Sequence, residues 1–223
     1  MLHTFISAGG LREAVLRIHG RGLRVGVVLR DPATASRVIE AARSHGFRPF
    51  WALSPEELPL DVEVVLHDGS FPAQRSIASL ELRGGEDPEE VLLRALSLYA
   101  SRRPGGLEVA VDPGIRTGAV FVKGGFLLCS GVFSGPGELL DAIRSVSRAV
   151  GEEPRAIYVG MTSAPPPLEL VEELKRAFPR ARIEMVPEGP MRDLRVPEDL
   201  KGDELDAYFI YLRAVTWGAQ TEP

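Results

Sequence analysis

Residues 109–122 read VAVDPGIRTGAVFV, and this stretch decides the fold of the second half of the chain. An apolar run ends in Asp112, and the Pro-Gly pair after it lets the backbone turn before a second apolar run begins at Gly118. A Lys-Gly-Gly turn then leads into a third run, residues 126–133 (FLLCSGVF). The pattern predicts a three-stranded antiparallel meander, with Asp112 ending its first strand at the rim of the sheet.

The remaining segments of this half alternate between helix and strand patterns. Helices are expected at residues 138–150, 168–178 and 202–215, and strands at residues 156–161 and 182–186. The order βββαβαβα predicts an α/β fold with a mixed five-stranded sheet. The first and fourth strands of that sheet lie side by side at its centre, and their carboxyl ends point the same way.

The last predicted helix carries two acids that complete a candidate site with Asp112. Asp203 and Asp206 are three residues apart and therefore share one helical face. If that face packs over the strand ends, three carboxylates converge, and their repulsion predicts a bound Mg²⁺ or Mn²⁺. Two such ions would activate water and hydrolyse a phosphodiester. The predicted catalytic residues and metal ligands are therefore Asp112, Asp203 and Asp206.

Each of these acids also has an ordinary structural interpretation. Asp-Pro-Gly at Asp112 is common turn chemistry, and Asp203 after Gly202 suits the N-cap or first turn of a helix. Asp206 fits such an interpretation less well, because it lies near an apolar stripe where an unpaired acid would be costly. The predicted stripe comprises Leu205, Phe209 and Leu212.

Two segments of this half resemble RuvC-type Holliday-junction resolvases and the similar YqgF-like proteins. Residues 109–122 look like the family's opening hairpin, and residues 202–207 (GDELDA) resemble its last helix. The resemblance implies a ribonuclease-H-like domain over residues 107–223. It also implies a metal-dependent nuclease that acts on structured or branched nucleic acid, as in DNA recombination and repair. The residues expected to contact nucleic acid are Arg116, Thr117, Lys123 and Lys201.

One position departs from the family's pattern. The family places a second acid, usually Glu, at the end of the fourth strand, where residues 160–163 read GMTS. Thr162 or Ser163 could hold a metal-bound water, and Glu188 follows the fifth strand as another candidate. A catalytically degenerate binding or scaffold protein of the same fold is therefore an alternative function.

A further alternative is a nucleotide-binding protein of the actin, Hsp70 and sugar-kinase superfamily. The phosphate-binding hairpin of that superfamily also has an acid followed by Gly and Thr, much like Asp112, Gly114 and Thr117. Such proteins usually need two copies of the fold to enclose ATP, and the first half of this chain shows no matching hairpin.

Residues 1–102 predict a smaller α/β domain of unassigned role. A helix-like spacing at Leu11, Ala14, Val15 and Ile18 precedes four strand patterns and two helix patterns. The strands are expected at residues 24–29, 47–53, 62–67 and 76–82, and the helices at residues 34–44 and 89–101. Their alternation favours a mostly parallel sheet. Residues 102–106 (RRPGG) are interpreted as a flexible linker.

Composition sets the remaining expectations. A net charge of −5 argues against a generally basic surface and counts against the nuclease prediction. The lone Cys129 is interpreted as a small buried hydrophobe, so zinc is not expected.

The chain lacks a long apolar run and a signal-peptide pattern, which favours a cytoplasmic protein without a membrane segment. The 23 Arg against 3 Lys fit GC-rich coding or the hot habitat of a thermophile. The oligomeric state is left open, a homodimer included.

Overall fold

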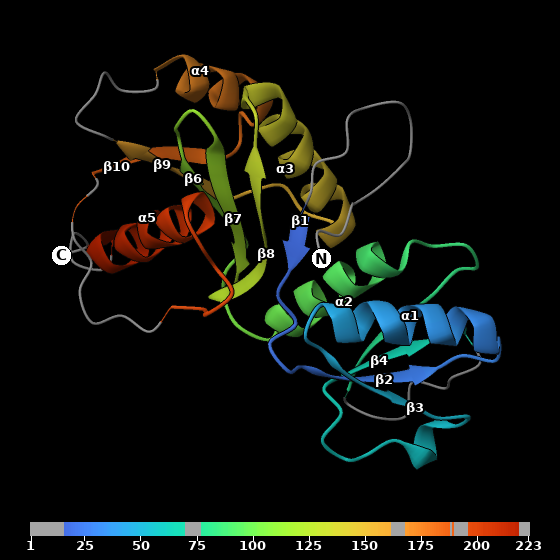
Figure 1. Ribbon diagram of the computed structural model, residues 1–223. Coiled ribbons are helices and arrows are strands. Elements are labelled where there is room, and N and C mark those ends of the chain that lie inside the picture. Colours follow the sequence, from blue (N-terminus) through green and yellow to red (C-terminus); the bar gives the residue numbers. More distant parts are fainter. Residues whose placement is uncertain (1–15, 70–76, 162–167, 188, 190–195, 219–223) are drawn as a thin grey trace.

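Two β-sheets organise the chain in the computed structural model, which describes residues 16–69, 77–161, 168–187, 189 and 196–218 (Figure 1). The larger sheet has six strands. In spatial order they are β1 (Leu16–Ile18), β8 (Phe126–Phe133), β7 (Thr117–Lys123), β6 (Leu107–Asp112), β9 (Ala156–Met161) and β10 (Arg182–Pro187). β6, β7 and β8 form the predicted antiparallel meander, and β9 and β10 continue the sheet in parallel with β6.

The pairing of β6 with β9 confirms the predicted centre of the sheet. The two strands are parallel, with Val111 opposite Val159, so both end at the same edge. β6, β7 and β9 are buried along almost their whole length, as expected for nearly continuous apolar runs. Asp112, the last residue of β6, is only partly buried and marks the rim of the sheet.

Helices cover both faces of the larger sheet (Figure 1). α5 (Asp203–Gly218) lies across one face, mainly over β6 and β7. α3 (Pro136–Val150), α4 (Leu168–Ala177) and α2 (Pro88–Ala100) pack on the opposite face. Alternate residues of β6 show the two layers, because Ala110 packs in the cluster under α5 whereas Val109 and Val111 pack in the other cluster.

β1 is the clearest departure from the predicted fold. The apolar spacing of residues 11–18 predicts a helix, but residues 16–18 form a strand that pairs antiparallel with β8 and adds a sixth strand to the expected five. Leu16 and Ile18 are buried while Arg17 between them is exposed, which is the period-two pattern of a strand. The other positions of the predicted helix, Leu11, Ala14 and Val15, lie outside the described residues.

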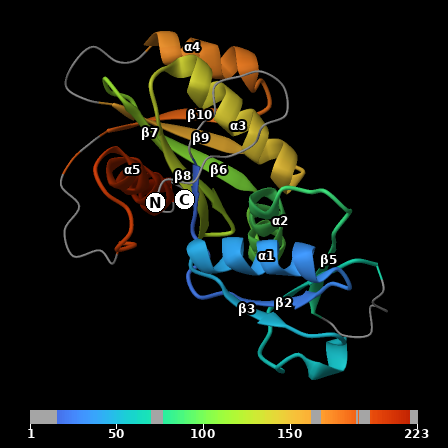
Figure 2. The same ribbon diagram turned by 45° about the vertical axis from the view of Figure 1, so that its right-hand side comes forward.

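The smaller sheet confirms the parallel arrangement predicted for the first half. Its four strands are all parallel. Their order is β3 (Arg48–Trp51), β2 (Arg24–Val28), β4 (Val64–His67) and β5 (Ala78–Glu81). α1 (Pro32–Ser44) and α2 cover one face, as Figure 2 shows, and the short 3-10 helix η1 (Pro55–Glu57) lies between β3 and β4 in the chain. Asp31 and Asp87 cap the two helices by accepting hydrogen bonds from first-turn backbone N–H groups.

One hydrophobic core joins the two sheets. It runs from the strands of the smaller sheet through α2 to β7 and α3. Residues 102–105 of the predicted linker are exposed, and the Arg103 guanidinium lies 4.5 Å from the ring centre of Phe126. The boundary expected between residues 1–102 and 107–223 therefore does not coincide with a break in the core.

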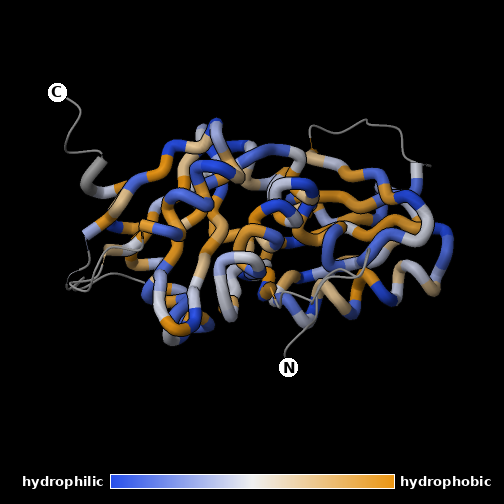
Figure 3. The backbone as a smooth tube through the Cα atoms, turned by 90° about the horizontal axis from the view of Figure 1, so that it is seen from above, coloured by the Kyte–Doolittle hydropathy of each residue, from blue (hydrophilic) through white to orange (hydrophobic). Residues whose placement is uncertain are grey.

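The distribution of apolar residues agrees with this layering. Hydrophobic and hydrophilic stretches alternate along the backbone, as Figure 3 shows, and β6, β7 and β9 are buried along almost their whole length. Cys129 is fully buried in β8, and burial raises the pKa of its thiol, which confirms the prediction of a small buried hydrophobe. Among the described residues, no helix combines the length and the apolar character needed to cross a bilayer.

Candidate functional site

The start of α5 lies directly on strand β7, beside the end of β6. A Cβ atom built at Gly118 would come within 2.0 Å of the backbone oxygen of Asp203 and 2.9 Å of its Cβ. Only glycine leaves room for this contact, because any side chain at residue 118 would overlap the helix backbone. Gly118 pairs with Asp112 across the β6–β7 hairpin. The first turn of α5 is thereby placed at the strand end that carries Asp112.

The three predicted acids lie in this region, at different depths. Asp112 and Asp203 are partly buried, and Asp206 is exposed. Neighbouring protein atoms desolvate the Asp206 carboxyl, and this desolvation, followed by the nearby charge of Asp203, raises its pKa above its ordinary value. The two helix acids are therefore close enough to repel each other, as their spacing predicts.

The buried face of α5 differs from the predicted stripe. The side chains that face the sheet are Glu204, Ala207, Ile210, Tyr211 and Ala214. The predicted stripe of Leu205, Phe209 and Leu212 is only partly buried, and Asp206 is exposed. The prediction that Asp206 lies beside a buried apolar stripe is therefore wrong. Apolar residues surround most of this helix, so its sequence does not single out the face that meets the sheet.

The described acids fit a metal ion only in part. Carboxylate oxygens are the donors that Mg²⁺ and Mn²⁺ prefer. The charge of Asp203 acts on the Asp206 carboxyl, so these two acids are near each other. Asp112 is the pairing partner of Gly118 on the neighbouring strand. Within the described residues, however, no three acidic, histidine or cysteine side chains are grouped closely enough to hold an ion. The predicted convergence of all three carboxylates is therefore incomplete in this structure.

The end of β9 offers no carboxylate in the part of the chain that the structure describes. Gly160 is buried and Met161 is partly buried at the edge where Asp112 ends the neighbouring strand. Thr162, Ser163 and Glu188, the predicted substitutes for the missing acid, lie outside the described residues.

Two of the four residues expected to contact nucleic acid are exposed in this region. The Arg116 side chain is 70% exposed, and its Nε lies 3.9 Å from Asp203 Oδ2. Lys201 is exposed in the segment just before α5. The positive charge of Arg116 therefore lies beside one of the predicted metal ligands.

Thr117 and Lys123 are wrong as predicted nucleic-acid contacts, because both are buried. Lys123 also lies at the opposite end of β7 from Gly118, a strand length from the acids. Its ammonium lies 3.1 Å from Ser97 Oγ of α2 and 3.1 Å from Glu152 Oε1. A lysine before a Gly-Gly turn suggests an exposed hairpin tip, but here α2 packs against that turn and buries the side chain.

A buried hydrogen-bond chain, the His19 network, joins β1 and β8 to the start of α5. His19 Nδ1 lies 2.5 Å from Asp199 Oδ2, and His19 Nε2 lies 2.9 Å from Ser130 Oγ. Ser130 donates to Glu204 Oε1 at 2.7 Å. His19, Ser130 and Glu204 are only 2%, 0% and 7% exposed. Arg17 completes the network, with its guanidinium 3.6 Å from Glu204 and donating to the backbone oxygen of Asp199.

The two ends of the network differ in what their hydrogen bonds do. Ser130 gives its single hydroxyl proton to Glu204, so its oxygen is the atom that contacts His19 Nε2. At the other end, the hydrogen bond of His19 lowers the pKa of the Asp199 carboxyl to about 2.

The order Asp199, His19, Ser130 is also the order of a serine-hydrolase triad. Ser130 cannot act as such a nucleophile, because it is fully buried in β8 and its hydroxyl donates to Glu204. A substrate carbonyl has no access to it. The network is therefore an internal connection between elements, not a second active site.

Sequence reasoning missed every member of the His19 network. Its residues are far apart in the chain, and no local motif joins them. The one available signal is Ser130, a hydroxyl in the otherwise apolar run FLLCSGVF, because a buried hydroxyl must find a hydrogen-bond partner. The identity of that partner depends on β1, which the sequence pattern assigned to a helix.

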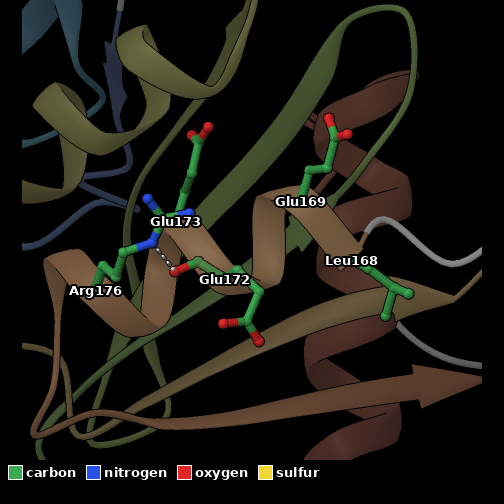
Figure 4. A pocket seen from close by; sticks show the side chains of 5 residues that line it. All are labelled: Leu168, Glu169, Glu172, Glu173 and Arg176. Carbon is green, nitrogen blue, oxygen red and sulfur yellow. Dashed lines mark hydrogen bonds between the residues drawn. The ribbon is translucent and has the colours of Figure 1, made fainter.

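A shallow depression of about 410 Å³ lies on α4, which packs on the sheet face opposite α5 (Figure 4). Its lining residues all come from this one helix and are Leu168, Glu169, Glu172, Glu173 and Arg176. Arg176 Nε donates to the backbone oxygen of Glu172 at 3.2 Å. Three carboxylates against one guanidinium make the depression acidic, which disfavours a nucleic-acid backbone there.

Comparisons with known proteins identify no family for this chain. No protein-family model and no curated protein matches it. Among solved structures, it is similar to Marinitoga piezophila Argonaute in complex with 5′-OH guide RNA, with 12% identity and a TM-score of 0.29. It is also similar to that Argonaute with guide RNA and target DNA, with 8% identity and a TM-score of 0.30. In both pairs the match covers 76% of this chain and 40% of the Argonaute chain.

Proposed function

We propose that this protein is a metal-dependent nuclease of the RuvC type that acts on structured or branched nucleic acid. Asp112, Asp203 and Asp206 would hold Mg²⁺ or Mn²⁺. The observation that carries the proposal is the contact between Gly118 and Asp203, since it brings the acids of α5 to the strand end that carries Asp112. Bound ions of this kind activate a water and stabilise the leaving oxygen of a phosphodiester.

The chain's own residues have separate tasks in this proposal. Asp112 would supply its carboxylate from the end of β6, where it pairs with Gly118 and the preceding Val111 pairs with Val159, and Asp203 and Asp206 would supply theirs from one helical turn. Arg116 and Lys201 are exposed beside them and would pair with substrate phosphates. Because the net charge of the chain is −5, attraction to a phosphate backbone has to come from such local positive charges.

A catalytically degenerate binding protein of the same fold is the second candidate. It is favoured by the incomplete grouping of the acids and by the absence of a carboxylate on β9 within the described residues. The ion pair between Arg116 and Asp203 points the same way, because the guanidinium lies beside a predicted metal ligand, where the metal cation itself is expected. A protein of this kind would bind nucleic acid equally well with and without divalent metal.

The actin-type alternative receives no support from the first half of the chain. The four strands of the smaller sheet are all parallel, so the described residues of this sheet contain no second copy of the β6–β7 hairpin. Two such copies are what an ATP-enclosing arrangement of that superfamily needs.

Cleavage of labelled four-way junctions and flaps, with Mg²⁺, Mn²⁺ or EDTA, tests the proposed function. We expect metal-dependent products from the wild type and none from Asp112→Asn. The matched control is Asp141→Asn, which removes a half-exposed carboxylate of α3 that pairs with Arg144 three residues later, and it should cleave like the wild type. Equal cleavage by Asp112→Asn would contradict the proposal. Metal-independent binding without cleavage would support the second candidate.

A further inference from the structure

We propose that His19 is a positioning residue: through Asp199 and Ser130 it holds the first turn of α5, and with it Asp203 and Asp206, against the sheet. The inference rests on the proposed nuclease function only for its consequence at the metal site. The placement of the helix turn itself can be measured without metal or substrate.

The first turn of α5 needs an anchor other than hydrophobic burial. Residues 203–206 contain three acids, and their one apolar side chain, Leu205, is only partly buried. A turn of this composition gains little from apolar contact, so a charged or hydrogen-bonding partner has to hold it against the sheet.

His19 supplies that partner on both sides of the point where the chain enters the helix. One ring nitrogen contacts Asp199, before the helix, and the other reaches Glu204, inside its first turn, through the Ser130 hydroxyl. Between these anchors the backbone passes through Gly202, whose φ of +53 is in the left-handed region. Two anchors that bracket this turn fix the direction in which α5 starts.

The imidazole itself is carried by a backbone held at two places. His19 N donates to the backbone oxygen of Leu128 in β8 at 3.0 Å, and Gly20 N donates to the backbone oxygen of His45 after α1 at 2.9 Å. The segment after β1 therefore joins the smaller-sheet unit to the start of α5. In this proposal, β1 and the residues after it help to position the candidate site, a role that their sequence does not suggest.

Hydrogen exchange at the start of α5 tests the inference directly. The backbone N–H groups of Leu205 and Asp206 both donate to the Gly202 oxygen, at 2.8 and 3.0 Å, and report on the first turn. We expect His19→Ala to lower their protection by about tenfold, because the buried hydrogen bond to Ser130 and the partly buried one to Asp199 are both lost. Protection of the Tyr211 amide, further along α5, should change by no more than the global stability does.

Two conservative variants separate a positioning role from a merely structural one. Gln places its amide nitrogen near the His Nε2 position and can still donate to Ser130, whereas Asn places it near Nδ1 and can donate only to Asp199. Because Ser130 is the link to Glu204, His19→Gln should restore most of the protection and His19→Asn should restore less. His67→Ala is the control, since it removes another buried histidine from the smaller sheet.

Three results would overturn the inference. The first is protection of the Leu205 and Asp206 amides in His19→Ala that stays within twofold of wild type. The second is a loss of protection in His19→Ala that is the same at every amide of the protein. The third is a loss in His67→Ala that is confined to the Leu205 and Asp206 amides. If His19→Ala does not fold, Ser130→Ala removes a single buried hydroxyl and should give the same local loss.

Mn²⁺ titration of the same variants then separates this inference from the proposed function. With a metal site present, His19→Ala should weaken Mn²⁺ binding and His19→Gln should restore it. Local loss of protection with no Mn²⁺ binding even in the wild type would leave the positioning role intact and count against the nuclease proposal alone. Unchanged protection with normal Mn²⁺ binding would remove the positioning role alone.

Discussion

The backbone oxygen of Asp203 lies so close to the Cα of Gly118 that a Cβ at residue 118 would be 2.0 Å from it. This contact connects the start of α5 to the β6–β7 hairpin, in which Gly118 is the partner of Asp112. The candidate site depends on it, because any side chain at residue 118 would push the acids of α5 away from Asp112.

Gly118→Ala should therefore destabilise the fold by about 2–3 kcal/mol, as overpacking of a closed contact does. Chemical denaturation measures the change. The control is Gly137→Ala in the first turn of α3, where a new Cβ meets nothing within 4 Å and alanine favours the helix, so stability should hold or rise. A wild-type denaturation midpoint for Gly118→Ala would show that α5 does not sit on β7 in this way.

Asp206→Asn should make the metal-free protein slightly more stable at neutral pH. The pKa of Asp206 is raised in the folded state, so this carboxyl favours folding when protonated, and that contribution is lost as pH rises through the folded pKa. Removing the charge should gain a few tenths of a kcal/mol, about 0.5 at most, since the side chain is exposed. Thermal unfolding in EDTA should show the gain at pH 7 and no gain below the ordinary Asp pKa of 3.8. Lower stability of the variant at pH 7 would contradict the assigned environment.

Asp199→Asn should have the opposite effect, because its hydrogen bond to His19 lowers the Asp199 pKa to about 2. A lowered carboxyl pKa contributes stability above the ordinary value, and that stability is lost as pH falls from about 4 towards 2. The variant should be less stable than wild type by up to about 1 kcal/mol at pH 7, since Asp199 is half exposed. Urea denaturation at several pH values should show the difference shrinking in acid, and a constant difference would argue against the pair.

Substitutions at Lys123 and Arg116 should change different properties of the protein, stability in the first case and nucleic-acid binding in the second. Lys123→Met removes the ammonium that contacts Ser97 and Glu152, so it should lower stability by about 1–2 kcal/mol and leave DNA binding unchanged. Arg116→Ala removes an exposed side chain and should weaken DNA binding with little change in stability. Fluorescence anisotropy with a labelled junction, beside denaturation, measures both. Weaker DNA binding by a folded Lys123→Met would overturn the structural role assigned to this lysine.

Most elements of the larger sheet could be predicted from sequence because their patterns are long and bounded. The run FLLCSGVF coincides with β8, and α3 ends at Gly151, whose φ of +75 is the left-handed geometry expected at a helix end. The parallel pairing of β6 with β9 also follows from the order of elements and the handedness of crossovers.

What could not be predicted depends on tertiary contacts. Three residues are too short a window to show whether Leu16 and Ile18 follow a strand or a helix period, so β1 was missed and its Arg17 and His19 with it. Burial of Lys123 depends on α2 lying over the β7–β8 turn, which no local pattern encodes. The buried face of α5 is hidden by apolar residues around most of the helix.

The central claim is that Asp112 and the acids of α5 form one divalent-metal site. Isothermal titration of Mn²⁺ into the wild type, Asp112→Asn, Asp206→Asn and the control Asp141→Asn tests it most directly. We predict binding to the wild type and to Asp141→Asn, and loss of binding in both Asp112→Asn and Asp206→Asn. Absence of binding in the wild type, or binding that survives both site substitutions, would contradict the claim.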